Sequence, residues 1–194
     1  MTDISSIVNL DHHPITVSEE YLKKCKNSLR NNSILQLNNF LLPDSLKKIQ
    51  NESHILHSKA YYCSQNHTVL LTKKDHKMGN LDPCNIEVIS DKGCVPHDLI
   101  PKSSDLNTLY QSKHFKFFLK NVFGIKKIFP YNDKLSSINY NYYEKKQQLG
   151  WHFDNASFAI TLMIQSPESG GIFQYINKGR DYENNFIDKD LIGK

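Results

Sequence analysis

The feature that most constrains the fold is a change of pattern near residue 125. From this point onward the sequence contains short runs rich in β-branched and aromatic residues, separated by turn residues: KKIFPY, SSINYNYYE, FAITLMIQ and GGIFQYI. In the third run, residues 158–165, large apolar residues alternate with smaller or polar ones, which is the period of a strand with two different faces. This pattern predicts an antiparallel sheet in the second part of the chain.

Helical patterns dominate the first part of the chain, residues 1–124. Thr16 and Glu19 fit a capping box before apolar residues at helical spacing, and Pro43 suits the first position of a second helix. A third helix is predicted over residues 104–124, where a glycine provides the stop signal. Helices followed by a sheet indicate an α+β fold, in which N-terminal helices support a jelly-roll barrel from the outside.

Length and composition limit the class of protein. A chain of 194 residues is predicted to form a single domain. Its net charge of +4 rests on 22 lysines and only two arginines, which disfavours nucleic-acid recognition because arginine usually reads phosphates and bases. The sequence has no apolar run long enough to span a membrane, no secretory leader and no paired cysteines. We therefore expect a cytoplasmic protein without nucleic-acid or membrane partners, and its oligomeric state stays open.

Two groups of potential metal ligands lack the pattern of a metal site. His54 and His57 lie i, i+3 on the second predicted helix, but no third ligand accompanies them. Cys84, Cys94 and His97 are spaced more widely than the ligand pairs of tetrahedral zinc sites. We interpret the histidines as surface or half-buried side chains and the cysteines as reduced thiols.

His152 and Asp154 form the candidate chemical centre, within the stretch LGWHFDN. At the end of a strand, residues i and i+2 project to the same side, so the imidazole and the carboxylate can converge on one ion. Such a pair suits Fe(II), whose oxygenase sites use two histidines and one carboxylate. The motif alone is weak, because nine histidines and 13 aspartates among 194 residues produce about 0.6 such pairs by chance.

The residues around this motif resemble the Fe(II)/2-oxoglutarate-dependent oxygenases, whose fold is a double-stranded β-helix, a form of jelly roll. The closer likeness is to the branch that hydroxylates or halogenates free amino acids. Its four motifs are NxNxY, LGWHFD, a strand like FAITLMIQ, and GGxFxY. They correspond to residues 139–143, 149–154, 158–165 and 170–175.

This resemblance implies roles for individual residues. His152 and Asp154 would bind Fe(II), and Asn141 and Tyr143 would bind 2-oxoglutarate, with dioxygen as the oxidant. An amide and a phenol can both donate hydrogen bonds to a carboxylate. Lys146 stands where the family pattern often has glycine, so the turn there is expected to differ.

Asp154 bears on the type of reaction that the resemblance implies. Chlorinating members have glycine or alanine at this position, which leaves room for a halide on the metal. The aspartate therefore favours hydroxylation of an unactivated C–H bond in a small polar substrate such as a free amino acid. The candidate substrate-binding residues near it in sequence are Trp151, Asn155 and Arg180, followed by Glu144 and Ser157.

Two residues that the resemblance implies are missing from this sequence. The family has a second histidine on a late strand and then an arginine or lysine that clamps 2-oxoglutarate. None of the 42 residues after His152 is a histidine, and Arg180, the only later arginine, lies in a polar segment expected to be a surface loop. We therefore expect a truncated chain, inactive alone, with helical support and short strands over about residues 1–124 and the first part of a barrel over residues 125–194.

Two other interpretations stay open at this point. The chain could be a non-catalytic binding protein derived from the same fold, in which His152 and Asp154 are vestigial. It could also be an unrelated α+β module in which these two residues only hydrogen-bond a turn. Fe(II) or Mn(II) affinity that is unchanged by His152→Ala would rule out the metal site and favour the last interpretation.

Overall fold

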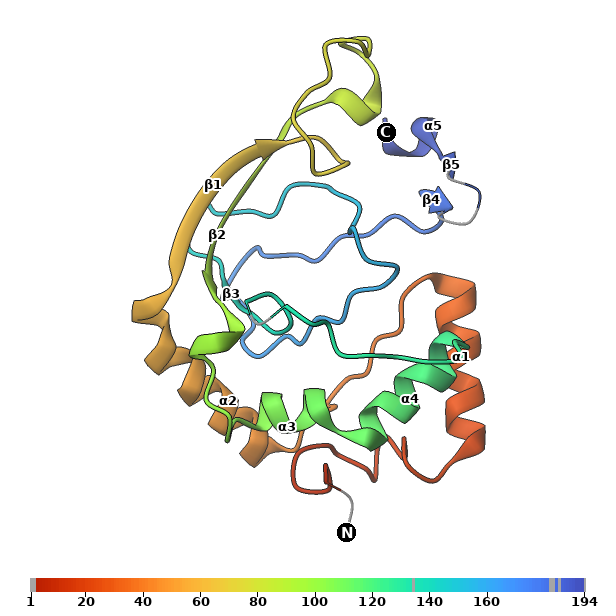
Figure 1. The fold of residues 1–194 in the computed structure, drawn as a ribbon, viewed down its shortest axis with the longest axis vertical. Helices are drawn as coiled ribbons and strands as arrows, with labels where there is room; N and C mark the ends of the chain where they lie inside the picture. The colour runs from red at the N-terminus through yellow and green to blue at the C-terminus, as the bar shows by residue number, and fades with distance from the viewer. Residues whose placement is uncertain (1–2, 134, 182–183, 185, 194) are drawn as a thin grey trace. The chain divides into compact units, whose positions relative to one another are not determined.

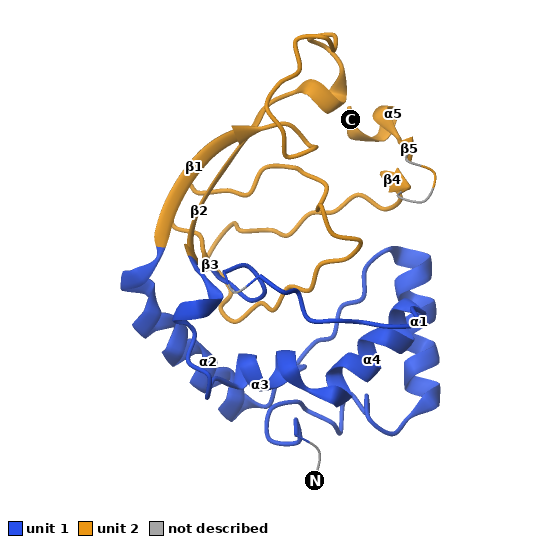
Figure 2. Cartoon of the chain, in the orientation of Figure 1, with its two compact units in different colours: residues 1–60, 95–140 blue, residues 61–94, 141–194 orange. Residues whose placement is uncertain are grey.

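The structure is a computed structural model that describes residues 3–133, 135–181, 184 and 186–193. It consists of α-helices and antiparallel strands, which confirms the predicted α+β class. The described residues form two compact units, each made of two segments of the chain: residues 1–60 with 95–140, and residues 61–94 with 141–194 (Figure 2). The expected single domain, with its division near residue 124, stays a prediction.

The first unit is helical (Figure 1). Its described elements are α1 (Glu19–Asn32), α2 (Pro43–Leu56), α3 (Asp105–Gln111) and α4 (Lys113–Phe123), with short 3-10 turns η1 (His57–Lys59) and η3 (His97–Leu99). Helix α1 packs against α4, and α2 packs against α3. The apolar side chains that are almost fully buried in this unit are Ile4, Ile7, Val8, Ile15, Ile49, Val95 and Phe118.

The helix boundaries follow local capping, in part as predicted. Helix α2 begins at Pro43, as its sequence indicates. The predicted capping box at Thr16 is wrong, because Ser18 caps α1 and its hydroxyl oxygen accepts a hydrogen bond from the backbone N–H of Tyr21 at 3.1 Å. The third predicted helix is divided into α3 and α4 by Ser112. This residue leaves the helical conformation and caps α4 with its own side chain.

The second unit contains a small antiparallel sheet. Its described elements are β1 (Tyr61–His67), η2 (Pro83–Asn85), β2 (Val88–Val95), β3 (Tyr140–Tyr142), β4 (Arg180–Asp181), β5 (Phe186–Ile187) and α5 (Lys189–Ile192); β2 and β3 each have an end residue in the first unit. Strand β2 lies between β1 and β3, and β4 pairs separately with β5. Tyr62 is paired with Gly93, and a Cβ atom on Gly93 would lie 2.7 Å from the Tyr62 ring. The glycine therefore leaves room for the tyrosine ring beside the backbone of β2.

Of the four β-rich runs, only residues 136–144 contribute a strand, β3, in the described part of the chain; residues 126–131 form none. Residues 158–165 and 170–176 lie in no hydrogen-bonded ladder, and among the described residues the strands do not close a jelly-roll barrel. Several of their large side chains are exposed, including Ile160 at 54% and Ile172 at 81%. The pattern of a strand is local, whereas a ladder needs a partner strand, and the described residues supply none to these segments.

Other expectations from composition can also be compared with the structure. No helix in the described part of the chain has the length and apolar character needed to cross a membrane. All four cysteines are free thiols, in agreement with the reduced state expected for them. His97 is engaged through its two ring nitrogens with Ser137 and Asn107, so its imidazole is committed to hydrogen bonds rather than to zinc. The cytoplasmic location stays a prediction.

The buried face of α4 leads to a first testable prediction. Phe118 is 2% exposed and stacks on Phe115, with the ring centroids 6.3 Å apart. Phe118→Ala should lower the free energy of unfolding by about 3–5 kcal/mol, because it leaves a cavity in the core. Urea denaturation followed by circular dichroism measures this loss.

A matched control is available on the same helix. Phe117 is 50% exposed, and Phe117→Ala should change the free energy of unfolding by about 1 kcal/mol or less. Equal losses for the two variants would show that the assignment of the buried face is wrong.

Candidate metal centre

His152 and Asp154 lie in an irregular segment of the second unit and face one another. The His152 Nε2 and Asp154 Oδ1 atoms are 3.4 Å apart, and their side chains are 19% and 54% exposed. The other ring nitrogen, Nδ1, lies 2.7 Å from the carbonyl oxygen of Gly150. A carbonyl oxygen can only accept, so Nδ1 carries the proton and the lone pair of neutral His152 is on Nε2, which faces the carboxylate.

This arrangement fits two ligands of one transition-metal ion. A histidine that binds a metal usually donates its other ring N–H to a backbone carbonyl or a carboxylate, as His152 does to Gly150. Two donor atoms at about 2.1 Å from an ion, at right angles, are roughly 3.0 Å apart, close to the observed separation. The described residues contain no cluster of three or more histidine, cysteine or acidic side chains that could hold a metal. The pair thus offers two potential donor atoms and no third one from a neighbouring histidine, cysteine or acidic side chain among the described residues.

A buried hydrogen-bond chain holds Gly150 against β2. The Gly150 N–H donates to the Ser90 hydroxyl oxygen at 2.9 Å, and that hydroxyl lies 2.6 Å from His67 Nε2. His67 Nδ1 donates to the carbonyl oxygen of Thr68 at 2.8 Å, so Nε2 must accept the Ser90 proton. His67 and Ser90 are only 4% and 6% exposed. Every donor in this chain has an acceptor, which specifies one position for the Gly150 backbone.

The close approach of Gly150 to β2 requires a glycine. A Cβ atom at this position would lie 2.7 Å from the Ile89 carbonyl oxygen and 2.7 Å from a methyl group of Val88. On the other side of His152, the N–H of Phe153 donates to the carbonyl oxygen of Val69 at 2.7 Å. The backbone is therefore anchored two residues before His152 and one residue after it.

Asn141 and Tyr143, the predicted 2-oxoglutarate residues, lie at the end of β3 and just after it. Asn141 is exposed, and Tyr143 is 48% exposed. Desolvation, with a smaller contribution from Cys94, raises the pKa of the Tyr143 phenol. The phenol is protonated at neutral pH with or without this shift, and it can donate a hydrogen bond. None of the hydrogen bonds described in the structure links either residue to His152. Lys146, the expected departure from glycine, still adopts a left-handed backbone with φ of 73°.

Of the three predicted substrate residues, Arg180 is placed differently from expectation. It begins β4, where it is half-buried and paired with Ile187, so the predicted surface loop is wrong. Its guanidinium carbon lies 5.6 Å from the centroid of the Phe153 ring, a cation–π contact next to His152 in sequence. Trp151 is 44% exposed and Asn155 is exposed, so both remain accessible to a ligand. Of the two weaker candidates, Glu144 accepts a hydrogen bond from Tyr62 at 2.9 Å, and Ser157 is exposed.

Sequence reasoning missed the residues that position His152. Ser90 lies 60 residues before Gly150, and His67 lies 23 residues before Ser90. No local pattern marks such pairs, because they meet only through the pairing of β1 with β2. The one local signal was Gly150 within the motif, because a glycine next to a candidate site can mark a close approach of two backbone segments.

The family of this chain is established by comparison. A model of the halogenase D family (HalD) matches residues 17–193, which include His152 and Asp154. The chain belongs to the halogenase D family. A comparison with curated proteins gives no match.

Membership of the halogenase D family agrees with part of the resemblance seen in the motifs. It indicates an enzyme with a halogenase-related function and is compatible with an oxygenase type of chemistry. The family match by itself identifies neither a metal nor a co-substrate, nor the molecule that is modified. Those features depend on the side chains around His152.

The anchoring of Gly150 leads to a second prediction. Gly150→Ala should lower the free energy of unfolding by about 1–3 kcal/mol, because the added methyl group meets the backbone of β2 and a buried valine. Gly79→Ala is the control, since nothing lies within 4 Å of a Cβ atom there. Urea denaturation measures both. A Gly150→Ala variant as stable as Gly79→Ala would contradict the close contact.

Proposed function

We propose that this halogenase D family chain is the metal-binding part of an Fe(II)/2-oxoglutarate-dependent dioxygenase. The reaction is hydroxylation of an unactivated C–H bond in a small polar molecule, such as a free amino acid. The observation that carries the proposal is the Asp154 carboxylate, 3.4 Å from Nε2 of His152. A histidine and a carboxylate on one face are two of the three protein ligands of non-haem Fe(II) oxygenases, which leave the other positions open.

Asp154 supports hydroxylation even though the family is named for halogenation. A halide can bind the metal only where a coordination position is free of protein ligands. In the chlorinating branch that the motifs resemble, glycine or alanine frees that position. Here the carboxylate of Asp154 faces the metal-binding nitrogen of His152 and would take the same position.

The residues of this chain would hold and orient the reagents. When bound, Fe(II) and 2-oxoglutarate supply the activation of dioxygen and the oxidising power needed to break a C–H bond. His152 and Asp154 would hold the metal, with the Gly150 carbonyl fixing the imidazole. Asn141 and Tyr143 would donate hydrogen bonds to a carboxylate of 2-oxoglutarate through an amide N–H and a phenol O–H.

The substrate proposal rests on polar groups next to the pair. Arg180 lies over Phe153, and a guanidinium suits the carboxylate of an amino acid because it donates two parallel hydrogen bonds. Asn155 could contribute a further polar contact, and Trp151 an apolar wall. A small polar molecule is therefore the proposed ligand class.

The finer description of the fold is also part of the proposal. Residues 158–165 alternate between two kinds of side chain, and their exposed apolar groups are suited to pack inside a barrel. We propose that these residues and residues 170–176 are strands of a double-stranded β-helix. Residues 153–194 contain no histidine, so they do not supply the second histidine of the family pattern.

A second candidate function follows from the partial ligand set. No cluster of three or more potential metal ligands exists among the described residues, which favours a non-catalytic binding protein of the same fold. Such a protein would bind a small polar molecule without oxidising it. Metal binding separates this candidate from the first.

The metal proposal gives a third prediction. The chain should bind Mn(II), used as an air-stable substitute for Fe(II), and 2-oxoglutarate should tighten this binding. His152→Ala and Asp154→Ala should each weaken Mn(II) binding by about tenfold or more, because each removes a ligand. Titration followed by electron paramagnetic resonance of free Mn(II) measures the affinities.

His114→Ala is the matched control for this titration. His114 Nδ1 lies 2.7 Å from a carboxylate oxygen of Asp3, so this is a second histidine–aspartate pair, and both of its side chains are 42% exposed. This variant should bind Mn(II) as the parent chain does. Affinity unchanged by His152→Ala would contradict the metal site. If oxidation of a free amino acid is observed by mass spectrometry, addition of oxygen supports hydroxylation and addition of chlorine overturns it.

A further inference from the structure

The positive charge of this protein is concentrated in one part of the chain. Residues 106–132 contain five lysines and no acidic residue, whereas the rest of the chain carries 19 basic and 20 acidic side chains. The net charge of +4 therefore comes from this stretch alone. A block of like charge that is not neutralised by its own neighbours indicates an anionic partner.

The structure gathers this charge on the outer face of α4. The helix buries Phe115, Phe118 and Val122 on one side. Lys113, Lys116, Phe117 and Lys120 follow one another at i, i+3, i+4 and i+7, so they share the opposite face. The buried apolar side chains thus lie on one face of the helix, and the lysines lie on the other together with the exposed Phe117.

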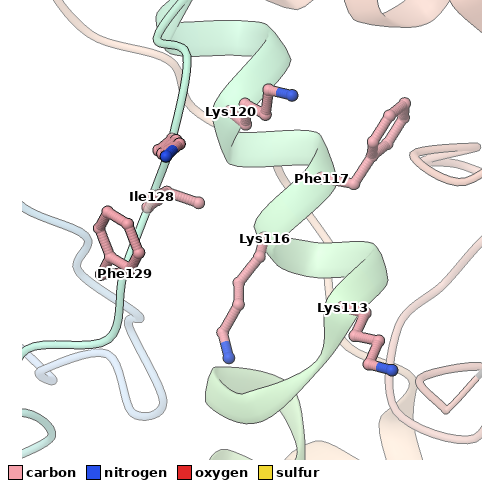
Figure 3. Close-up of a pocket in the computed structure, with 7 residues that line it drawn as sticks. Lys113, Lys116, Phe117, Lys120, Ile128 and Phe129 are labelled. Atoms are coloured by element: carbon pink, nitrogen blue, oxygen red, sulfur yellow. The ribbon is translucent and has the colours of Figure 1, made fainter.

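A chain reversal extends this face into a groove. Gly124 adopts a left-handed backbone with φ of 68° and ends α4, after which the chain runs back beside the helix. Lys127, Ile128 and Phe129 from the returning segment complete a groove of about 400 Å³. Figure 3 shows Lys116 on the side of the helix that faces Ile128 and Phe129. We call this surface the lysine groove.

The lining of the lysine groove combines charge with exposed aromatic rings. Its described lining contains four lysines, two phenylalanines and an isoleucine, and no acidic side chain. Phe117 is 50% exposed and Phe129 is 75% exposed. Asp3, the carboxylate at the N-terminal end of α4, is engaged with the Ser112 hydroxyl and His114. Large exposed aromatic rings next to charged groups are typical of protein-binding surfaces.

We propose that the lysine groove docks an acidic, partly apolar segment of a partner protein. Carboxylates of that segment pair with the lysines, and an apolar side chain packs against Phe129 and Ile128. The groove contains no arginine among its described lining residues, so it lacks the planar donor that grips phosphates in a bidentate way. Lysines act as point charges, which suffice for the carboxylates of a peptide. This docking is independent of the proposed metal chemistry.

The test is binding of a fluorescein-labelled peptide in which aspartate and glutamate alternate with leucine and phenylalanine. Fluorescence anisotropy with the full 194-residue chain should show binding that weakens as salt is added. The same peptide with asparagine and glutamine in place of the acids should not bind. The double variant Lys116→Glu/Lys120→Glu should weaken binding by about tenfold or more, and Phe129→Ala by several-fold.

A matched charge reversal separates docking from general attraction. Lys47 and Lys48 are both exposed on α2, so Lys47→Glu/Lys48→Glu changes the net charge by the same amount outside the groove. This control should retain the affinity of the parent chain, with circular dichroism showing both double variants folded. Equal loss in the two double variants, no binding of the acidic peptide, or tighter binding of a labelled single-stranded DNA would each overturn the proposal.

Discussion

The candidate site depends on one hydroxyl group, that of Ser90. It donates to His67 and accepts from the Gly150 N–H, so it connects the ends of β1 and β2 to the segment that carries the metal-ligand pair. Because the Thr68 carbonyl can only accept, the direction of each hydrogen bond in the chain is determined. The Gly150 carbonyl at the end of the chain then determines which nitrogen of His152 is free to bind a metal. The buried hydrogen bonds from His67 through Ser90 to Gly150 thus help to determine which ring nitrogen of His152 faces Asp154.

The position of Asp154 is the second determinant of the chemistry. The family is named for halogenation, but reaction type depends on what occupies the metal's coordination positions rather than on the fold. In the proposed metal site, a carboxylate facing His152 Nε2 would compete with a halide for such a position. The cation–π contact of Arg180 with Phe153 places a second charged group near the pair. These two charged groups are the basis on which a small polar substrate is proposed.

Features that depend on a few neighbouring residues could be predicted from the sequence. Features that depend on pairing between distant residues could not. Pro43 at the start of α2 and the α+β class follow from patterns within a few residues. The division of the third helix at Ser112 was missed because a serine within a helical pattern can also cap a new helix. Residues 158–165 have the period of a strand but no ladder, since pairing depends on residues elsewhere. For the same reason the His152–Asp154 pair was found from i, i+2 spacing, whereas Ser90 was not.

The lysine groove shows why counts of charged residues are weak evidence without positions. A lysine-rich composition predicts a solvated surface when the lysines are spread among acidic neighbours, because nearby opposite charges cancel at a distance comparable to the Debye length. In residues 106–132 there are no acidic neighbours, and helical periodicity places three of the five lysines on one face of α4. Their potentials add along that face instead of cancelling. The same net charge therefore predicts solubility if it is dispersed and recognition of an acidic partner if it is ordered.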